Sequence, residues 1–437
     1  MKTNYPILRQ ILFAAMPLVL LAGCSDKDDP APIGVAGVEM SKPTLELSLD
    51  GTERLTATVT PDNAADKTLT WSSSDEAVAT VSSEGVITAV RAGHATITAA
   101  AGGKTGTCAL TVNPDIYVAG YEQKENNPDV AVVWKNGKKL YSLTDGKRYA
   151  GAWSVFVSDG VVYTAGEEGS ENGKDVAKVW KNGTVLHALT DGKQNVYAVS
   201  IFVSGGAVYT AGYERNENGK PVAKVWKDGT ELHALTDGKQ NAYASSVFVS
   251  GGVVYTVGQE RNENDKYVAK VWKGGTVLHS LTDGKRYADA SSVFVSGGVV
   301  YTAGYEDNEN GKSVAKVWKD GTVLHTLADG TRYSNASSVY VADGDVYVCG
   351  VEEVRENVYM LQVWKNGKVL HSYTPADQKE EAWLNSISVW DGDVYTAGYD
   401  GSADGYFGKV WKNDGELYTL TANGNASSIF VYTGPER

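Results

Sequence analysis

The sequence predicts an all-β protein in which an antiparallel β-sandwich precedes a seven-bladed β-propeller of four-stranded blades. Tryptophan recurs seven times, at spacings of 46 residues and finally of 47, from Trp134 to Trp411. The chain also contains 48 glycines and 25 tyrosines, a composition typical of short strands joined by tight turns. The repeat region has no helical periodicity, so an internal repeat of this length indicates an array of β-blades.

Length and charge narrow the choice of partners. With 437 residues the chain is long enough for two or three domains. Its formal net charge is −13, and it has no basic stripe with interleaved aromatic residues, so nucleic acid is not expected as a partner. The sequence leaves the oligomeric state open.

The first residues have the features of a targeting segment. Lys2 and Arg9 provide positive charge, and the apolar run at 11–22 is too short to span a bilayer as a helix. The run leads into LAGC, which resembles the lipobox of bacterial lipoproteins. The resemblance implies a signal peptide at residues 1–23 and acyl chains on Cys24 that anchor the protein to a membrane. An ordinary signal peptide followed by a stray cysteine is the alternative.

Residues 24–34 are interpreted as an acidic tether. The stretch Lys27-Asp28-Asp29 resembles the signal that sends some Gram-negative lipoproteins to the outer face of the outer membrane. We therefore expect a lipid-anchored outer-membrane protein that faces the cell exterior. A solvated, disordered tether is the simpler interpretation, and the two are compatible.

Residues 35–113 are predicted to form the first folded module. Seven short segments alternate apolar and polar residues, as at Leu45, Leu47 and Leu49, which favours an antiparallel sandwich. The stretch LTWSSSDEAVATVSSEGVITAVRAGHATITA resembles the bacterial Ig-like group 2 family. The resemblance implies an immunoglobulin-like spacer or adhesion module without catalytic residues. Trp71 is expected in its core, and His94 has no expected role.

Only Asn113 and Pro114 separate this module from the repeat region at 114–437, so the two domains are expected to lie close together with limited freedom. Cys108 and Cys349 fall in different domains, each within a strand pattern. Two buried free thiols are therefore expected rather than a disulfide, and no spacing such as CxxC indicates a metal site.

Each repeat divides into four strands. Within 245–282 the segments SSVFVSGG, VVYTVGQE, YVAKVWKGG and TVLHSLTDG are rich in β-branched and aromatic residues, with turn residues between them. Four antiparallel strands in a repeat of this length are typical of a propeller blade. The sequence of the repeats resembles that of repeat propellers in Gram-negative surface lipoproteins of unknown function.

The order of the strands predicts how the ring closes. The repeat region opens at 115–122 with a second strand and ends at 427–434 with a first strand. The two are expected to share one blade, with the last strand paired to Ile116–Tyr121, which removes an open sheet edge. A phase in which every blade begins at VYTAG is disfavoured, because the long four-to-one connections suit crossings between blades.

Recurrent histidines are the clearest candidates for metal ligands. They lie in five different blades, on the strand expected outermost, too far apart to share one ion. These residues are His187, His233, His279, His325 and His371. The DGDVY segments at 343–347 and 391–395 fit Asp-Gly turns better than calcium loops. No metal, cofactor or serine-hydrolase elbow is expected.

The loops between the fourth and first strands are predicted to surround the central channel. They carry aromatic residues beside Arg, Asn and Gln, a combination that suits stacking and hydrogen bonding to sugars or peptides. The candidate ligand-binding residues are Arg148, Tyr149, Tyr197, Tyr243, Arg286, Tyr287, Arg332, Tyr333 and Trp383. The alternative is that these tyrosines pack on the blade tops while the polar residues are merely solvated.

The favoured function is a non-enzymatic, cell-surface lipoprotein that binds or adheres to a glycan or protein through this loop face. Blades two to five are near copies, whereas an active site needs unlike residues at one place. The alternative is a surface polysaccharide lyase or hydrolase, with its site in blades six and seven at the channel mouth, near 351–359, 375–385 and 401–407. A buried carboxylate with a perturbed pKa there would favour this alternative.

Overall fold

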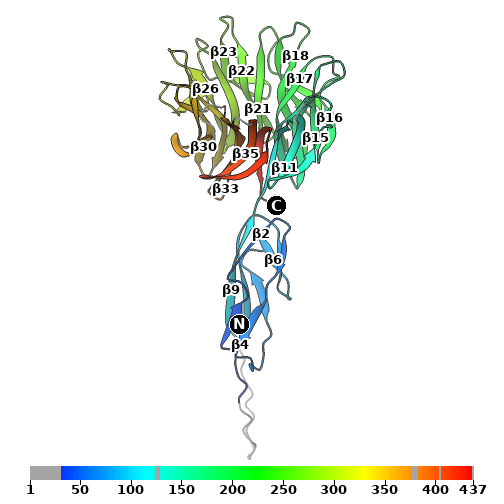
Figure 1. The fold of residues 1–437 in the computed structure, drawn as a ribbon, viewed down its shortest axis with the longest axis vertical. Helices are drawn as coiled ribbons and strands as arrows, with labels where there is room; N and C mark the ends of the chain where they lie inside the picture. The colour runs from blue at the N-terminus through cyan, green and yellow to red at the C-terminus, as the bar shows by residue number, and fades with distance from the viewer. Residues whose placement is uncertain (1–30, 124–127, 376–381, 403–404, 436–437) are drawn as a thin grey trace, which may run out of the picture.

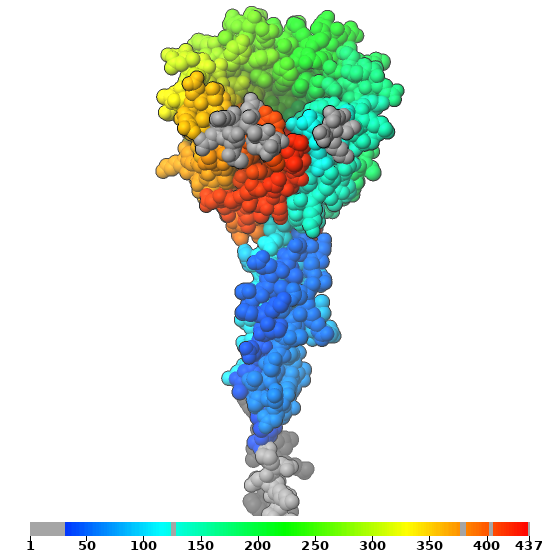
Figure 2. All heavy atoms as spheres, viewed as in Figure 1, coloured from blue at the N-terminus to red at the C-terminus, as the bar shows by residue number. Residues whose placement is uncertain are grey.

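The structure is a computed structural model and describes residues 31–123, 128–375, 382–402 and 405–435. Within these ranges all regular structure is β-strand, and no helix is long and apolar enough to cross a membrane. The predicted all-β class is therefore confirmed. The chain builds a narrow stalk from its N-terminal module and a wide head from its repeats (Figure 1, Figure 2).

The stalk is a β-sandwich whose core comes from alternate, inward-pointing strand residues. Its nine strands are β1 (Gly37–Met40), β2 (Thr44–Ser48), β3 (Thr52–Arg54), β4 (Ala57–Thr60), β5 (Thr70–Ser73), β6 (Ala79–Val81), β7 (Val86–Ala89), β8 (Gly93–Ala101) and β9 (Lys104–Asn113). One sheet has the order β2-β9-β8-β5, the other β3-β7-β6, and β1 pairs with β4. Leu55, Ile87, Ile97 and Leu110 are each at most 1% exposed, and Trp71 packs against this core.

The sandwich differs in detail from the prediction. It has nine strands rather than seven, because β1 and β3 were not among the predicted segments. In addition, β2 pairs with β9 in parallel, although antiparallel pairing was expected. Residues 41–43 are not in a strand and separate β1 from β2. β2 then joins the other sheet beside β9, which runs in the same direction.

The head consists of seven four-stranded sheets, numbered here as blades one to seven. Blade one contains β37 (Gly424–Tyr432), β10 (Asp115–Glu122), β11 (Val130–Lys135) and β12 (Lys138–Ser142). Blade two contains β13 (Ala150–Ser158), β14 (Val161–Gly169), β15 (Asp175–Lys181) and β16 (Thr184–Ala188). Blade three contains β17 (Val196–Ser204), β18 (Ala207–Arg215), β19 (Pro221–Lys227) and β20 (Thr230–Ala234).

The remaining blades repeat this pattern. Blade four contains β21 (Ala242–Ser250), β22 (Val253–Arg261), β23 (Tyr267–Lys273) and β24 (Thr276–Ser280). Blade five contains β25 (Ala288–Ser296), β26 (Val299–Asp307), β27 (Ser313–Lys319) and β28 (Thr322–Thr326). Blade six contains β29 (Ser334–Ala342), β30 (Asp345–Arg355), β31 (Val358–Lys365) and β32 (Lys368–Tyr373). Blade seven contains β33 (Ala382–Trp390), β34 (Asp393–Ser402), β35 (Gly405–Lys412) and β36 (Gly415–Thr421).

The last strand completes blade one. β37 pairs antiparallel with β10, with Ile116 opposite Val431 and Tyr121 opposite Asn425. Each of seven apolar clusters joins two neighbouring blades, and one of them joins blade seven to blade one through Val410 and Ile429. The ring is therefore closed, and the exposed edge of β10 that an open array would leave is covered.

The recurrent motif VAKVWKDGT is explained by contacts that every blade needs. Its tryptophan is buried between blades, at most 5% exposed in any of the seven. The following lysine lies over the ring of a tyrosine in the second strand, as Lys319 does over Tyr301 with 5.7 Å from Nζ to the ring centroid. Asp320 adopts a positive φ of 45°, and its Oδ1 accepts a hydrogen bond from Val300 N at 2.9 Å.

The recurrent histidines also have a structural place. Four of the five pack against the turn glycine of the next blade, so that a Cβ added at Gly229 would lie 2.7 Å from Nδ1 of His187. Tyr141 occupies the equivalent place against Gly183. In blade seven the neighbour is Asp414, whose Oδ1 lies 2.6 Å from Nδ1 of His371. The histidines thus space the blades apart at the outer edge of the ring.

The stalk meets the head at more than the chain connection. Ala92 N donates to Thr433 O at 2.8 Å, and His94 Nε2 lies 2.9 Å from Asp391 Oδ2. Asp391 belongs to the turn between the first and second strands of blade seven, so these turns face the stalk. The loops that lead into the inner strands lie at the opposite ends of those strands, away from the stalk.

Candidate functional site: the mouth of the propeller channel

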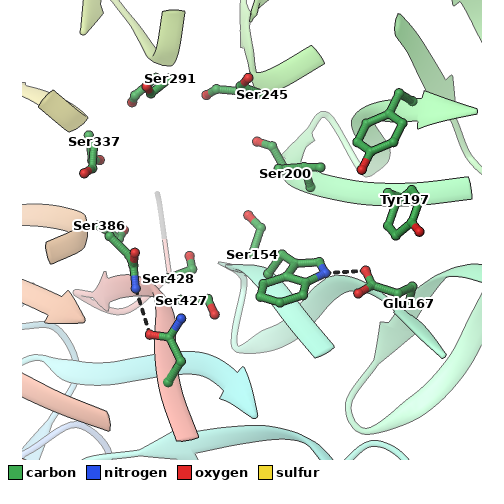
Figure 3. A pocket seen from close by; sticks show the side chains of 18 of the residues that line it. Ser154, Glu167, Tyr197, Ser200, Ser245, Ser291, Ser337, Ser386, Ser427 and Ser428 are labelled. Carbon is green, nitrogen blue, oxygen red and sulfur yellow. Dashed lines mark hydrogen bonds between the residues drawn. The ribbon is translucent and has the colours of Figure 1, made fainter. Parts of the chain in front are cut away.

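A belt of serines lines the channel. One serine from the inner strand of each blade occupies the same position, and in six junctions its Oγ accepts a hydrogen bond from a backbone N–H of the next blade at 3.1–3.3 Å. The belt contains Ser154, Ser200, Ser246, Ser292, Ser338, Ser386 and Ser428. Figure 3 labels Ser154, Ser200, Ser386 and Ser428. The belt links the inner strands to one another and gives the channel a rigid, polar wall.

An aromatic girdle lies on the stalk side of the belt. Phe156, Phe202, Phe248, Phe294 and Tyr340 follow one another around the channel, with ring centroids 4.6–5.0 Å apart. Phe430 joins Phe156 at 4.7 Å, and blade seven has Ser388 at this position. The girdle separates a mouth cavity of about 730 Å³ from a second cavity of about 730 Å³ that faces the stalk.

The mouth cavity is asymmetric, because its aromatic residues and two of its three carboxylic acids gather in blades two and three. Trp153 Nε1 donates a hydrogen bond to Glu167 Oε2. Tyr197 Oη donates to Asp175 Oδ2 at 2.5 Å. Tyr149, Trp153, Tyr197 and Tyr213 line this side of the cavity together with both carboxylic acids (Figure 3). We call Trp153, Glu167, Asp175 and Tyr197 the acid cluster.

Glu167 is the most strongly perturbed acid of the cluster. Its side chain is 1% exposed, and burial raises its pKa to about 8. The Trp153 indole N–H opposes this rise only in part. The raised pKa favours the protonated form of the Glu167 carboxyl at neutral pH.

A second buried acid lies across the channel. Asp289 belongs to the inner strand of blade five, and burial raises its pKa to about 6. Its Oδ2 accepts a long hydrogen bond of 3.4 Å from Ser291 Oγ, and within the described residues Oδ1 has no partner. Glu167 and Asp289 stand on walls three blades apart, so they do not form a close carboxyl pair.

The structure distributes the nine sequence-predicted ligand residues over three places. Tyr149 and Tyr197 line the mouth cavity, whereas Tyr333 and Trp383 line a smaller cleft of about 170 Å³ between blades six and seven. Tyr243 and Tyr287 continue a row of tyrosines over blades three to five.

The three predicted arginines do not point into the cavity as a group. Arg148 pairs with Glu171 at 2.9 Å and Arg286 with Glu309 at 3.3 Å, in each case a residue of the two-to-three loop of the same blade. Arg332 is exposed near Asp329. Arg148 and Arg286 thus link one loop to another, and the three arginines do not form a common anion site.

Trp153, Glu167 and Asp175 were not predicted as site residues. The predicted residues lie mostly in loops, whereas Trp153 and Glu167 lie within strands, at positions that hold other residues in sister blades. Blade five has Ser291 and Tyr305 there. Aligning the repeats and asking where one blade departs from all others would have found these residues.

The alternative site predicted in blades six and seven is only partly covered by the described residues. Asp400, a buried acid of blade seven, pairs with Lys409 at 3.0 Å. Glu352 of blade six has a raised pKa because of burial, but it does not line the mouth cavity. Residues 376–381 and 403–404 of the two predicted segments lie outside the described residues. The perturbed acids of the mouth are in blades two and five.

No group of three or more His, Cys, Asp and Glu side chains in the described part of the chain could hold a metal ion. Cys108 and Cys349 are free and buried, as predicted.

Fold and site together define a stalk-mounted β-propeller with a polar, partly aromatic cavity at the end of its channel. Residues 34–112 match the family model of the bacterial Ig-like domain (group 2), which confirms the interpretation of the stalk. Two curated relatives are glycosidases. An α-L-arabinofuranosidase of Bifidobacterium longum is 38% identical over 131 residues, 26% of this chain and 12% of that protein. A lacto-N-biosidase of Bifidobacterium bifidum is 37% identical over 115 residues, 24% of this chain and 10% of that protein.

The chain thus spans about an eighth or less of the length of these relatives. Among solved structures, a sialidase from Trypanosoma rangeli is 12% identical, with a TM-score of 0.37 over 67% of this chain and 56% of that one.

Proposed function

We propose that this protein is a carbohydrate-active surface protein that takes a glycan into the mouth cavity and hydrolyses a glycosidic bond at the acid cluster. The observation that carries the proposal is Glu167, a carboxylic acid with a pKa raised to about 8, on the wall of a cavity shared with the Asp175 carboxyl and several aromatic rings. Two relatives that act on glycosides support carbohydrate as the ligand class.

The chemistry assigns different tasks to the two acids. Glycoside hydrolysis needs a protonated acid at the leaving oxygen and a second carboxyl group that acts as base or nucleophile. Glu167 suits the first task, because its raised pKa keeps the proton at neutral pH. Asp175, oriented by the Tyr197 hydroxyl, is the candidate for the second. The rings of Tyr149, Trp153 and Tyr213 offer faces on which a sugar ring can stack.

Glycan binding without cleavage is the second candidate. It is favoured by one observation, namely that Glu167 is only 1% exposed and hydrogen-bonded to Trp153. In this case Glu167 positions the Trp153 ring for stacking, and no proton reaches the sugar. This candidate keeps the non-enzymatic function expected from the sequence, whereas the glycosidase relatives favour cleavage.

The experiment compares the full chain with Glu167→Gln and Asp175→Asn on arabinofuranosyl, galactosyl and lacto-N-biosyl oligosaccharides, with calorimetry and reducing-end analysis on the same samples. Glutamine is tolerated at the equivalent position of blade four, Gln259. Glu171→Gln in the same blade, an exposed position, is the control.

Hydrolysis by wild type that falls at least about a hundredfold in Glu167→Gln supports the proposal. Binding without products, weakened in Glu167→Gln, supports the second candidate. If none of these oligosaccharides binds or is cleaved, both candidate functions are overturned.

We also propose that the protein is anchored through acyl chains on Cys24 and displayed on the outer membrane, with the mouth directed away from the membrane by the stalk. Cys24 lies outside the described residues. Changing Cys24→Ala is expected to move the protein from the membrane to the soluble fraction, and added protease should digest wild type on intact cells. Membrane retention of Cys24→Ala would contradict the anchor.

A further inference from the structure

A continuous row of tyrosines leads from the acid cluster along the rim of the head. Tyr197 and Tyr213 stack with centroids 4.7 Å apart, and Tyr243 meets Tyr213 edge-on at 4.8 Å. Tyr267 follows at 6.1 Å and Tyr287 at 6.2 Å. We call these five residues the tyrosine arc. It begins at Asp175, which accepts the hydrogen bond of Tyr197, and ends in blade five.

The fold itself does not require the arc. Its members occupy four different positions of the blade, since only Tyr197 and Tyr243 are equivalent, and sister blades hold other residues at each of them. Blade five has Asp289 in place of Tyr243 and Ser313 in place of Tyr267. Blade four has Asn241 at the place of Tyr287. The tyrosines form a line across near-identical blades only because they change position from blade to blade.

The arc is suited to carbohydrate rather than to apolar packing. Tyr287 is 40% exposed and the other four residues are half-buried, so part of each residue is accessible to solvent. Lys266 Nζ lies 4.2 Å from the centroid of Tyr287 and adds a hydrogen-bond donor at the end of the row. Successive aromatic rings with polar groups between them match a linear chain of sugar rings, which has apolar faces and hydroxyl edges.

We propose that the tyrosine arc is an extended binding track for a linear, neutral oligosaccharide or polysaccharide, of which one unit reaches the acid cluster. This deepens the proposed function and rests on it for the ligand class. A neutral chain is favoured, because the protein carries a net charge of −13 and repels polyanions. The arc runs over neighbouring blades, so the chain lies across the rim.

The test measures binding of linear arabino- and galacto-oligosaccharides from disaccharide to octasaccharide to the full chain by calorimetry. Each occupied ring is expected to tighten binding roughly threefold to tenfold, so affinity should rise with length up to the end of the arc. In the double variant Tyr267→Ser and Tyr287→Asn, the rise should stop at short chains, while disaccharide affinity stays at the wild-type value.

The two substitutions copy residues of sister blades, and thermal unfolding checks that the variant folds. Tyr406→Ser, at a 44% exposed tyrosine outside the arc, is the matched control and should behave as wild type. Galacturonan oligosaccharides of equal length should bind more weakly than neutral chains; stronger binding would overturn the neutral-chain assignment.

The outcomes separate this inference from the proposed function. Length-dependent binding that the double variant loses supports the arc, even if Glu167→Gln changes nothing and the proposed hydrolysis fails. Binding or cleavage that depends on Glu167 but not on chain length or on Tyr267 and Tyr287 overturns the arc alone. Absence of binding for every chain length overturns both.

Discussion

Blade two and blade five share one framework and differ at the mouth. Trp180 and Trp318 are buried between blades at 0% and 1% exposure, and each lies one residue before a lysine that covers a tyrosine ring. At the channel mouth, blade two presents Trp153 and Glu167, whereas blade five presents Ser291 and Tyr305 at the same positions.

The comparison shows which positions the ring constrains. A residue that contacts the neighbouring blade faces the same surface in every blade, so the same side chain fits best everywhere. The side chains at the positions of Trp153 and Glu167 instead face the mouth cavity, where sister blades hold different residues. Side chains at the mouth can therefore differ between blades without loss of packing between the blades. A functional site is expected at such positions.

The largest effect tests the framework as a whole. Deletion of residues 426–437 removes most of β37, and with it the pairing to β10 and the side chain of Ile429 in the cluster between blades seven and one. We expect loss of cooperative thermal unfolding, measured by calorimetry. Ile429→Ala, which keeps the strand, should cost much less. Wild-type unfolding of the truncated chain would refute the importance of closure.

The next effect tests whether the two blades are equivalent. Trp180→Ala and Trp318→Ala each empty a buried site and are expected to destabilise the protein by about 3–5 kcal/mol. Denaturant unfolding measures both, with Leu324→Ala on the exposed outer strand as control. Unequal losses in blades two and five would show that the framework is not shared as closely as their sequences indicate.

The pH dependence of stability should differ between the buried acids of blade two and blade five. The pKa of Glu167 rises from 4.5 to about 8 on folding, so unfolding releases its proton between these values. Its stabilising contribution is complete below pH 4.5 and falls as pH rises toward 8. Glu167→Gln should therefore raise the melting temperature more at pH 8 than at pH 5.

Asp289→Asn provides the comparison in blade five. The pKa of Asp289 rises from 3.8 to about 6, so its window is lower and narrower. Its effect should be complete by about pH 6 and smaller than that of Glu167→Gln. Identical melting curves for wild type and Glu167→Gln across pH 5–8 would show that Glu167 is not protonated in the folded protein.

The smallest effect concerns the turn between the third and fourth strands. Blade four has Gly274 where blade five has Asp320, and a Cβ at Gly274 would meet nothing within 4 Å. Gly274→Asp should stabilise the protein by about 1 kcal/mol through a new bond to Val254 N, and Asp320→Gly should cost about as much. Denaturant midpoints compare the two; a loss in both would contradict this role of the turn residue.

The repeat itself allowed most of the head to be predicted. The regular tryptophans and turn glycines indicated the number of strands, the number of blades and the shared first blade. These residues recur because turn geometry and the contact between blades are the same in every repeat. The same reasoning assigned the histidines to structure rather than to metal, and their packing against turn glycines such as Gly229 accords with it. Parallel pairing of β2 with β9 was not predictable, because alternation gives the buried face of a strand but not its neighbour.

The candidate site was predicted less well. Tyr149 and Tyr197 do line the mouth, but the acid cluster was missed, because a lone Trp or Glu inside a strand pattern looks like an ordinary variant of the repeat. The role of such a residue depends on which side chains of neighbouring strands contact it.

By itself the sequence determined the class of fold, the order of domains and the framework of each blade, since these follow from periodicity, turn chemistry and a contact that recurs seven times. Only the tertiary structure decided that Trp153, Glu167, Asp175 and Tyr197 share one wall of a cavity, and that tyrosines from three blades form one row. The physical reason is that burial, and with it the raised pKa of Glu167, depends on neighbours from other strands and blades, which no local pattern specifies.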